Sequence, residues 1–329
     1  MSTEQINADD VRIFAGSSNP AFADAVAAYL GVARSPARRG HYSNDSLFVQ
    51  LGASVRSRSV FIVQSFSPPV NEHLVELLMM LDAARTAGAS QMCAVIPYYS
   101  YARSDKKDTP RISVAGRLVA RLIETAGATQ VMTMSLHSPQ VHGFFDVPTD
   151  PLTARPVFEE HFRRLDVAEA VVVSPDAGRA HSASRFAQRL GLPVAVGNKT
   201  RISDKQVIVS GLIGDIAGRR QAIVYDDEIA SGTSVIETIK LLMAQGIQQV
   251  WPVCTHGIFA GEALQRLDAM PEVQQIITTD TVPIAPERRS DKLRILSVAP
   301  LFGEAIRRNY LRQSIGDLFS FWEEFKSEE

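Results

Sequence analysis

The chain has little cysteine, no long apolar run and almost no net charge. Two cysteines, Cys93 and Cys254, make neither a disulfide framework nor a thiolate metal site, and we expect both to be buried. No stretch approaches the roughly 20 apolar residues that span a bilayer. A formal net charge of −2 leaves no basic surface for nucleic acid. We therefore expect neither membrane nor nucleic-acid partners, and an acidic N-terminus without a signal-peptide core favours the cytoplasm.

Two segments of the chain, 61–97 and 222–254, follow one plan. In each, an apolar strand meets a polar loop, an amphipathic helix ends at a glycine, and a second apolar strand follows. Both segments predict parallel β-α-β units. With 329 residues, 45% of them hydrophobic, the chain can build two cored domains, and the repeat suggests that they are duplicates.

The remaining segments alternate in the same way. We expect strands over 10–15, 129–134, 169–174 and 193–196, and helices over 20–30, 112–126 and 179–190. This predicts an α/β fold made twice, each copy a mostly parallel sheet flanked by helices. Three prolines between Pro148 and Pro156 mark a boundary. We therefore expect domains over 1–150 and 151–301, with an amphipathic helix over 302–321 packing on the first.

Only the second copy carries paired carboxylates and a hydroxyl-rich turn. Asp226 and Asp227 leave an apolar strand, and the turn Ser231 to Ser234 leads into a helix. Carboxylates at a strand end suit ribose hydroxyls or a hydrated cation, whereas a helix N-terminus suits a phosphate. One loop can therefore hold both ends of a ribose 5-phosphate. An ordinary acidic turn with a helix cap is the alternative.

Further polar clusters follow other strands, where open α/β sheets bind their ligands. The stretch 97–103 offers Arg103 and tyrosine rings to a nucleotide or, alternatively, to a partner chain. His137 and Asp176 each follow an apolar run, and together they suit a Mg²⁺ ion that keeps several waters. A structural histidine and a helix cap are the alternatives.

The polar stretch 197–205 follows the expected strand 193–196, and we interpret it as a loop. It carries two cations, Lys199 and Arg201. Phosphoryl transfer depends mainly on positioning and on cations placed against developing oxyanion charge, and these two residues meet that need. A solvated loop without a role is the alternative.

With these motifs the chain resembles the ribose-phosphate pyrophosphokinases, also called phosphoribosyl pyrophosphate synthetases. The resemblance covers nearly the whole chain, and its markers include FAGSSNP (14–20), PYYSYARSDKK (97–107), VVSPDAG (172–178), DDEIASGTS (226–234) and THGIFAG (255–261). It implies two phosphoribosyltransferase-like domains per subunit and homodimers that assemble to a hexamer. It also implies a reaction in which the 1-hydroxyl of ribose 5-phosphate attacks the β-phosphorus of ATP and releases AMP.

The resemblance assigns roles to particular residues. Lys199 and Arg201 are implied as the catalytic cations on the transferring diphosphate. The ribose 5-phosphate site is implied to consist of Asp226, Asp227, Ser231, Gly232, Thr233 and Ser234. The nucleotide site is implied to consist of Tyr42, Asn44, Arg103, Ser104 and His137. His137 and Asp176 are implied to serve Mg²⁺.

The chain departs from the family pattern at several of these places. Ala230 and Ser135 stand where the family usually has aspartate, and Ser104 and the segment 42–46 differ on the adenine side. Glu228 partly replaces the carboxylate missing at 230. Two alternatives follow: a non-catalytic regulatory homologue, and a pyrophosphokinase with another sugar or nucleotide preference. The retained charged residues argue against the first.

Overall fold

The computed structural model describes residues 6–203 and 206–319, and for residues 199–203 and 206–210 it describes the backbone alone. The chain divides into two compact units. Unit 1 consists of Met1–Thr153, Thr281–Pro283 and Val298–Glu329, and unit 2 consists of Ala154–Asp280 and Ile284–Ser297. The chain thus returns to unit 1 twice. Within the described ranges, no helix is both long and apolar enough to cross a membrane.

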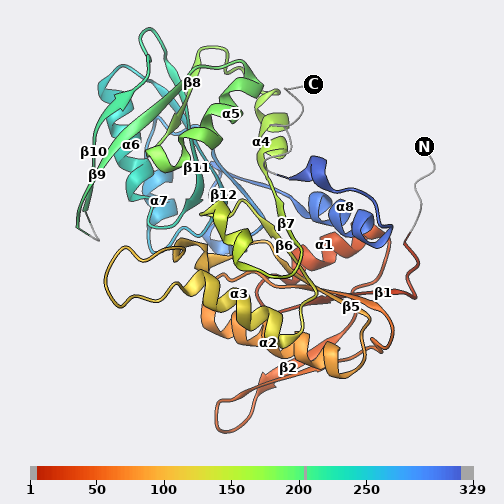
Figure 1. Cartoon of the computed structure of the whole chain (residues 1–329). Helices are drawn as coiled ribbons and strands as arrows, with labels where there is room; N and C mark the ends of the chain where they lie inside the picture. The colour runs from red at the N-terminus through yellow and green to blue at the C-terminus, as the bar shows by residue number, and fades with distance from the viewer. Residues whose placement is uncertain (1–5, 204–205, 320–329) are drawn as a thin grey trace. The chain divides into compact units, whose positions relative to one another are not determined.

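Unit 1 is built on a five-stranded parallel sheet with the order β1-β4-β5-β6-β7 (Figure 1). The predicted β-α-β unit over 61–97 is confirmed, because β4 and β5 pair in parallel across α2. β2 and β3 form a separate antiparallel hairpin. The elements of unit 1 are β1 (Val11–Ala15), α1 (Pro20–Leu30), β2 (Ala37–His41), β3 (Leu47–Leu51), β4 (Ser59–Val63), α2 (Val70–Thr86), β5 (Gln91–Ile96), η1 (Ser100–Arg103), α3 (Ala115–Ala126), β6 (Gln130–Met134), η2 (Pro139–Phe144), β7 (Thr149–Leu152), α8 (Ala299–Tyr310) and η5 (Gly316–Leu318).

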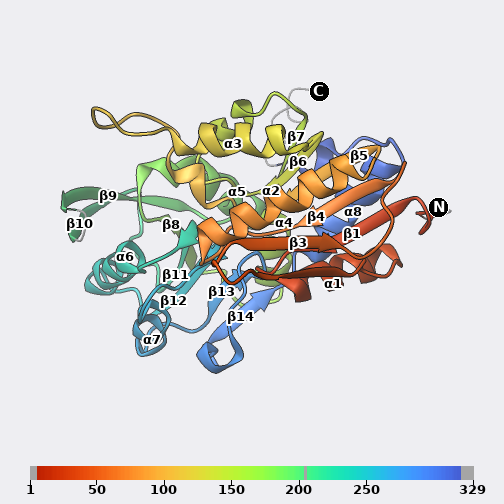
Figure 2. The same ribbon diagram turned by 90° about the horizontal axis from the view of Figure 1, so that it is seen from below.

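Helices cover both faces of this sheet, with α2 and α3 on one face and α1 beyond the other (Figure 2). Strand residues alternate between the faces, as a period of two requires. Phe14 and Ile62 therefore belong to one core cluster together with Leu77 of α2 and Ile123 of α3. The expected helix over 112–126 begins only at Ala115. Cys93 is buried in this unit as expected.

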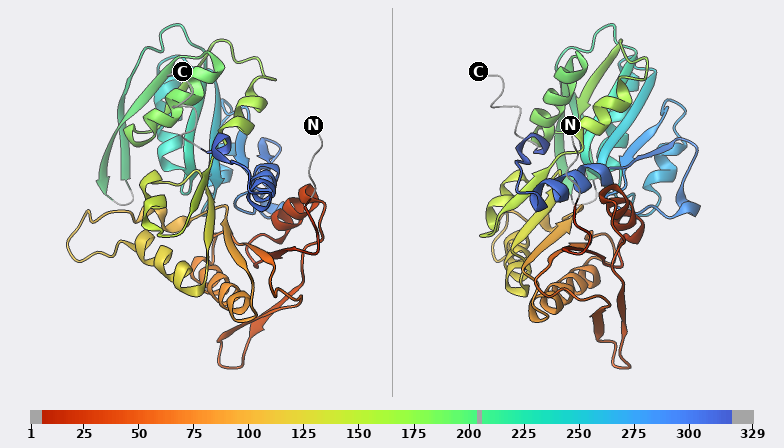
Figure 3. Two further views of the ribbon diagram at one scale, coloured as in Figure 1. Left: turned by 45° about the vertical axis from the view of Figure 1, so that its right-hand side comes forward. Right: turned by 90° about the vertical axis from the view of Figure 1, so that its right-hand side faces the viewer.

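The C-terminal helix α8 packs beside α1 (Figure 3). The rings of Phe22 and Phe302 meet edge to face with centroids 5.5 Å apart. The bounds predicted for this helix, 302–321, are wrong. It ends at Tyr310, and Arg312 then adopts a φ of 56°, a left-handed conformation that an α-helix does not contain. Residues 320 and 321 lie outside the described part of the chain.

Unit 2 is built on a seven-stranded sheet with the order β10-β9-β8-β11-β12-β13-β14, in which only β10 is antiparallel to its neighbour. The predicted β-α-β unit over 222–254 is confirmed, because β11 and β12 pair in parallel across α6. The elements of unit 2 are α4 (Arg155–Phe162), β8 (Ala170–Ser174), η3 (Ala177–Arg179), α5 (Ala180–Leu190), β9 (Val194–Ser203), β10 (Gln206–Ile213), β11 (Gln221–Ile229), α6 (Thr233–Ala244), β12 (Gln249–Gly257), α7 (Ala263–Asp268), β13 (Ile276–Thr279), η4 (Pro286–Arg288) and β14 (Leu293–Leu296).

Strand β9 is longer than predicted. Residues 197–203 of the stretch 197–205 are not a loop, because β9 continues to Ser203 and pairs with β10, and residues 204 and 205 lie outside the described part of the chain. Lys199 lies opposite Val209, and Arg201 lies opposite Val207. An edge hairpin is held by backbone hydrogen bonds and needs no buried face, so it lacks the strict apolar alternation from which strands are recognised in a sequence.

Aromatic packing fixes the middle of β11. The ring of Tyr225 stacks on that of Phe186 of α5, with centroids 4.7 Å apart, and meets Phe158 of α4 edge to face at 6.2 Å. On the other face of the sheet, Val224 packs in a cluster with Ile239 of α6. Asp226 and Asp227, which follow Tyr225 in the same strand, therefore belong to a strand whose position is set from both faces.

The strand order of unit 2 reverses between β8 and β11. The chain steps outward from β8 to β9 on one side and from β11 to β12 on the other. Open α/β sheets bind ligands beyond the carboxyl ends of strands at such a reversal. In the described strands of unit 1 the order advances in one direction from β1 to β7. The topology alone therefore favours a ligand site in unit 2.

A buried carboxyl group links three elements of unit 1. Asp150 of β7 is 7% exposed and accepts a hydrogen bond from Gln130 Nε2 of β6. Asn309 of α8 donates to Gln130 Oε1 at 2.6 Å. Burial raises the pKa of Asp150 to about 6, although the hydrogen bond from Gln130 opposes the rise.

The Asp150→Asn variant should be more stable than the wild type above pH 6. The folded carboxyl keeps its proton up to about pH 6, whereas the unfolded one ionises near its ordinary value, so the wild type loses stability as pH rises from about 4 to about 6. A pKa rise of this size corresponds to a loss of at most about 3 kcal/mol in the free energy of unfolding at high pH. Asparagine does not ionise and therefore does not incur this loss. Thermal unfolding at pH 4 and pH 8 measures the difference. Asp146→Asn, at an exposed position, is the control, and an equal effect of both changes at both pH values would contradict the assignment.

Candidate functional site

Asp226 and Asp227 lie in the carboxyl-terminal half of β11 and not, as the sequence predicts, in the loop that leaves it, because β11 continues to Ile229 and keeps its pairing with β12. Asp226 Oδ1 accepts a hydrogen bond from the backbone N–H of Asp227 at 2.9 Å. Burial raises the pKa of Asp226 well above its ordinary value, and the charges of Asp227 and Asp176 raise it further. The pair therefore holds unfavourable electrostatic energy, which a bound cation or hydroxyl donors relieve.

Asp176 also belongs to this cluster of carboxylates. It follows β8, and its Oδ1 accepts a hydrogen bond from the Gly178 N–H at 3.0 Å. The helix cap that the sequence left as an alternative is thus present, and it fixes the carboxylate at the end of the strand. Because its charge reaches Asp226, the two strand ends beside the reversal contribute to one anionic site.

Arg179 forms an ion pair with Asp227 that sequence reasoning missed. Its Nε lies 2.7 Å from Asp227 Oδ1, and the two side chains are 12% and 7% exposed. Arg179 is the last residue of η3, which follows β8. The ion pair therefore joins the loop after β8 to β11. A single arginine outside any motif gives no signal in the sequence, so only the structure reveals it.

The turn between β11 and α6 has the conformation expected of an anion site. Gly232 adopts a φ of 72° and lies immediately before α6, and in the described structure no side chain caps this helix. Ser231 Oγ lies 3.2 Å from Thr233 Oγ1. Backbone N–H groups, hydroxyls and the positive end of the helix dipole are thus gathered at one place.

A second loop of unit 2 fixes the start of this turn. The backbone N–H groups of Ile258 and Phe259 donate to Ile229 O at 3.1 and 2.9 Å, and that of Ala260 donates to Ala230 O at 2.9 Å. These donors come from the THGIFAG stretch, which the sequence marked only by resemblance. Ala230 therefore has an anchored backbone carbonyl, so a substitution there changes mainly the side chain.

The predicted catalytic cations are placed only by their backbone. Lys199 and Arg201 lie on β9, which neighbours β8 in the sheet. Their side chains lie outside the described part of the structure. Their catalytic role stays a prediction.

Tyr42 and Asn44 lie in the turn between β2 and β3. Tyr42 is 61% exposed, and its ring packs against Phe48 with centroids 5.3 Å apart. Asn44 Oδ1 accepts hydrogen bonds from the backbone N–H and the hydroxyl of Ser46 at 3.2 and 2.7 Å. The amide oxygen of Asn44 thus shapes the turn, and the nucleotide role of both residues stays a prediction.

Arg103 and Ser104 follow β5 in unit 1. Arg103 is exposed at the end of η1. The Ser104 hydroxyl donates to Ser113 O and accepts from the Ala115 N–H, both at 3.0 Å. Ser104 therefore closes the base of the loop 105–113, and binding of a nucleotide by these two residues stays a prediction.

Two of the tyrosines in the stretch 97–103 are core residues. Tyr98 and Tyr99 are 6% and 3% exposed, and the Tyr99 hydroxyl donates to Gly116 O at 2.9 Å. The suggestion that these rings offer faces to a base or to a partner chain is therefore wrong. Their burial follows from the packing of α3 against η1, which a tyrosine-rich sequence does not reveal.

His137 follows β6, as the sequence predicts, and is half-buried. Ser135 turns the chain between the strand and His137 with a φ of 43°, and its N–H donates to Leu152 O at 3.0 Å. Aspartate adopts this left-handed conformation more readily than serine. Whether His137 serves a nucleotide or a metal stays a prediction.

The corresponding strand ends of unit 1 are filled by a side chain of the unit itself. Glu76 of α2 is 2% exposed. The backbone N–H of Ser17 donates to both of its carboxylate oxygens, each at 3.0 Å, and the Ser17 hydroxyl donates to Oε2. Gln64 Nε2 donates to the same carboxylate at 2.8 Å. Because a methyl group on Gly16 would come within 2.2 Å of Gln64 Oε1, the packing is tight. Glu76 thus takes the place that an anion would occupy after β1.

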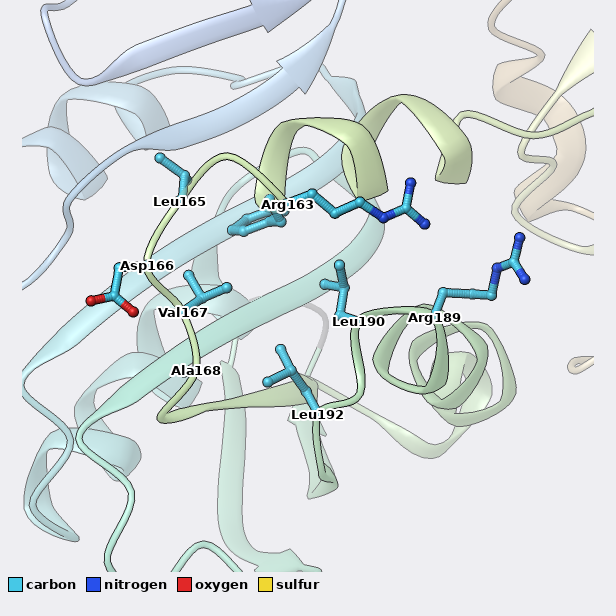
Figure 4. Close-up of a pocket in the computed structure, with 9 residues that line it drawn as sticks. Arg163, Leu165, Asp166, Val167, Ala168, Arg189, Leu190 and Leu192 are labelled. Atoms are coloured by element: carbon cyan, nitrogen blue, oxygen red, sulfur yellow. The ribbon is translucent and has the colours of Figure 1, made fainter.

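A cavity of about 380 Å³ lies elsewhere in unit 2, at the amino ends of β8 and β9 (Figure 4). Arg163 and Arg189 point to the same side of it, and each approaches Glu159 Oε2, at 3.6 and 3.7 Å. Within unit 2, Asp176 follows the carboxyl end of β8, Asp226 and Asp227 lie toward that of β11, and no predicted site residue lines the cavity. Because Glu159 already engages both arginines, we assign the cavity no ligand.

Comparisons with known proteins identify relatives over nearly the whole chain. The N-terminal domain of ribose phosphate pyrophosphokinase matches residues 11–127, and the phosphoribosyl synthetase-associated domain matches residues 200–320. A Streptomyces coelicolor protein provisionally named ribose-phosphate pyrophosphokinase is 52% identical over 94% of this chain and 98% of its own length. The ribose-phosphate pyrophosphokinase of Deinococcus radiodurans is 45% identical over 94% and 97%. The crystal structure of phosphoribosylpyrophosphate synthetase from Mycobacterium smegmatis has a TM-score of 0.86 and 36% identity, over 92% of this chain and 99% of the other.

The internal carboxylate of unit 1 leads to a prediction about Glu76→Ala. We expect this change to cost about 2–4 kcal/mol, because it leaves the partly buried N–H of Ser17 and one N–H of the buried Gln64 amide without an acceptor. Acetate should restore part of the stability, since it supplies the missing carboxylate. Thermal unfolding with and without acetate measures both effects.

Glu72→Ala provides the control, because Glu72 lies on the same helix with 46% of its side chain exposed. It should change little and should not respond to acetate. Equal losses for the two variants, or no selective effect of acetate, would show that Glu76 does not hold an anion position.

Proposed function

The chain belongs to the ribose-phosphate pyrophosphokinase family, and we propose on that premise that the carboxylates and the turn of unit 2 bind ribose 5-phosphate. The protein transfers the diphosphate of ATP to the 1-hydroxyl of ribose 5-phosphate and forms 5-phosphoribosyl 1-pyrophosphate and AMP. We further propose a cytoplasmic homodimer that assembles to a hexamer, as the resemblance implies.

The stretch from Asp226 to Ser234 carries the proposal. It begins with two carboxylates near the end of β11 and ends at the N-terminus of α6, beside the reversal of strand order. Carboxylates accept hydrogen bonds from ribose hydroxyls, and the turn donates N–H groups to a 5-phosphate. The anchored carbonyls of Ile229 and Ala230 keep the two ends at a fixed separation.

Members of this family use metal ions, and we propose Mg²⁺ for this chain. The carboxylates of Asp176, Asp226 and Asp227 fit a hard cation, because Mg²⁺ prefers oxygen ligands. We propose Asp176 as the ligand nearest the metal. His137 offers nitrogen, which Mg²⁺ binds less well, so we propose that it reaches the ion through water or contacts the nucleotide. When bound, the ion neutralises phosphate charge.

We propose that Lys199 and Arg201 stabilise the charge that develops on the transferring phosphates. Their place on β9, next to β8, supports this proposal. On the nucleotide side we propose Tyr42, Asn44 and Arg103 as residues that contact ATP. Ser104 takes part by holding the loop that follows Arg103.

Release of AMP tests the function. The pure protein with Mg²⁺, ATP and ribose 5-phosphate should release AMP and form a product with the mass of 5-phosphoribosyl 1-pyrophosphate. Reactions that lack ribose 5-phosphate, or that contain a metal chelator, are the controls. Absence of AMP in the complete reaction, while ribose 5-phosphate still binds in calorimetry, would point to the non-catalytic homologue. AMP release with a different sugar phosphate or nucleotide alone would point to altered preference.

Removing a proposed catalytic cation should reduce turnover. Lys199→Ala should lower kcat by about 100- to 1,000-fold, because the side chain acts on charge that develops only in the transition state. The KM for ribose 5-phosphate should change little. Lys240→Ala removes the same charge from an exposed site on α6 and should leave kcat unaltered. A change confined to the KM for ribose 5-phosphate would give Lys199 another role.

Ala230→Asp tests how the chain manages without a carboxylate at that position. We expect weaker binding of ribose 5-phosphate, because Asp226, Asp227 and Glu228 already concentrate negative charge where a phosphate dianion must enter. Ala230→Asn has the same size without the charge and should bind more tightly than the aspartate variant. KM values for the three proteins decide the question. A lower KM for the aspartate variant would show that Glu228 does not compensate.

A further inference from the structure

Arg179 is the side chain in the site of unit 2 to which the function assigns no role. It is largely buried, and it contacts Asp227, one of the two carboxylates proposed to bind ribose hydroxyls, at 2.7 Å. Removal of an arginine from water is favourable only when a partner compensates its charge. The arginine and the carboxylate therefore hold each other in place.

The contact also restricts how Asp227 can act. Arg179 approaches Oδ1 through Nε, and this contact limits the rotation of the Asp227 carboxylate. The neighbouring Asp226 carboxylate receives the backbone N–H of Asp227 and is thereby turned toward its own strand. The two aspartates are thus held in different orientations by different donors, although they are adjacent in the sequence.

Arg179 reaches Asp227 from the other side of the strand reversal. Arg179 is the last residue of η3, which begins directly after Asp176. In the same turn, the Gly178 N–H donates to the Asp176 carboxylate. One short turn after β8 therefore orients two carboxylates that belong to different strands. A displacement of this turn would disturb both of them.

We propose that Arg179 is a positioning residue that presents the Asp227 carboxylate in a fixed orientation to the ribose hydroxyls. This inference rests on the proposed function of unit 2. It makes Arg179 a determinant of ribose 5-phosphate affinity rather than of phosphoryl transfer. Its effect passes through Asp227.

Steady-state kinetics of Arg179 variants test the proposal. Arg179→Ala should raise the KM for ribose 5-phosphate at least tenfold, while kcat and the KM for ATP stay within about threefold. Arg179→Lys keeps the charge but loses the planar Nε–H and should recover part of the affinity. Arg189→Ala removes the same charge from the far end of α5 in unit 2, where the arginine faces Glu159, and should leave both KM values unaltered.

A double-mutant cycle shows whether Arg179 acts through Asp227. Asp227→Asn alone should raise the KM for ribose 5-phosphate, and adding Arg179→Ala should then have little further effect. Additive effects, a loss confined to kcat, or an unaltered KM in both Arg179 variants would overturn the proposal. If Arg179→Ala does not fold, Arg179→Lys decides alone, and a KM equal to that of the wild type overturns the proposal. A wild type that releases no AMP refutes the proposed function instead, so the two failures are distinct.

Discussion

The reversal of strand order between β8 and β11 is the constraint on which the site of unit 2 depends. It separates the loops that follow two adjacent parallel strands, so that neither covers the other, and it leaves their polar side chains at one edge of the sheet. Asp176 comes from one side of this reversal and Asp227 from the other. The aromatic packing of Tyr225 and the carbonyl anchors after β11 then fix what the topology has brought together.

The two units contain the same β-α-β arrangement, but only the sheet of unit 2 reverses its strand order in the described strands. Both have a parallel β-α-β unit, and both place polar residues after the first strand. In unit 1, Gln64 after β4 and Ser17 after the neighbouring β1 both donate to Glu76. In unit 2 the carboxylates gather instead, with Arg179 as a counter-charge. The difference lies in which groups the protein itself supplies, an anion in one case and a cation in the other.

Much of this could be predicted from the sequence, because the period of apolar residues reports buried faces. The two β-α-β units and His137 after a strand are read correctly, whereas Asp226 and Asp227 lie inside β11 and not in the loop after it, because polar residues continue the pairing with β12 beyond the apolar run. The extension of β9 to Ser203 is not, since an edge hairpin need not alternate. Glu76 is also missed, because a glutamate in an amphipathic helix ordinarily faces water. Arg179 and the loop 258–260 act through contacts between distant segments, which no local pattern encodes.

The carboxylate of Glu76 has a consequence for the stoichiometry of ligand binding. A duplicated chain could present two equivalent places for a sugar phosphate, and occupancy of one could then alter the other within a single polypeptide. Because Glu76 already accepts the donors after β1 and is covalently attached, a free anion must displace it to bind there. A titration should therefore end at one ribose 5-phosphate per chain.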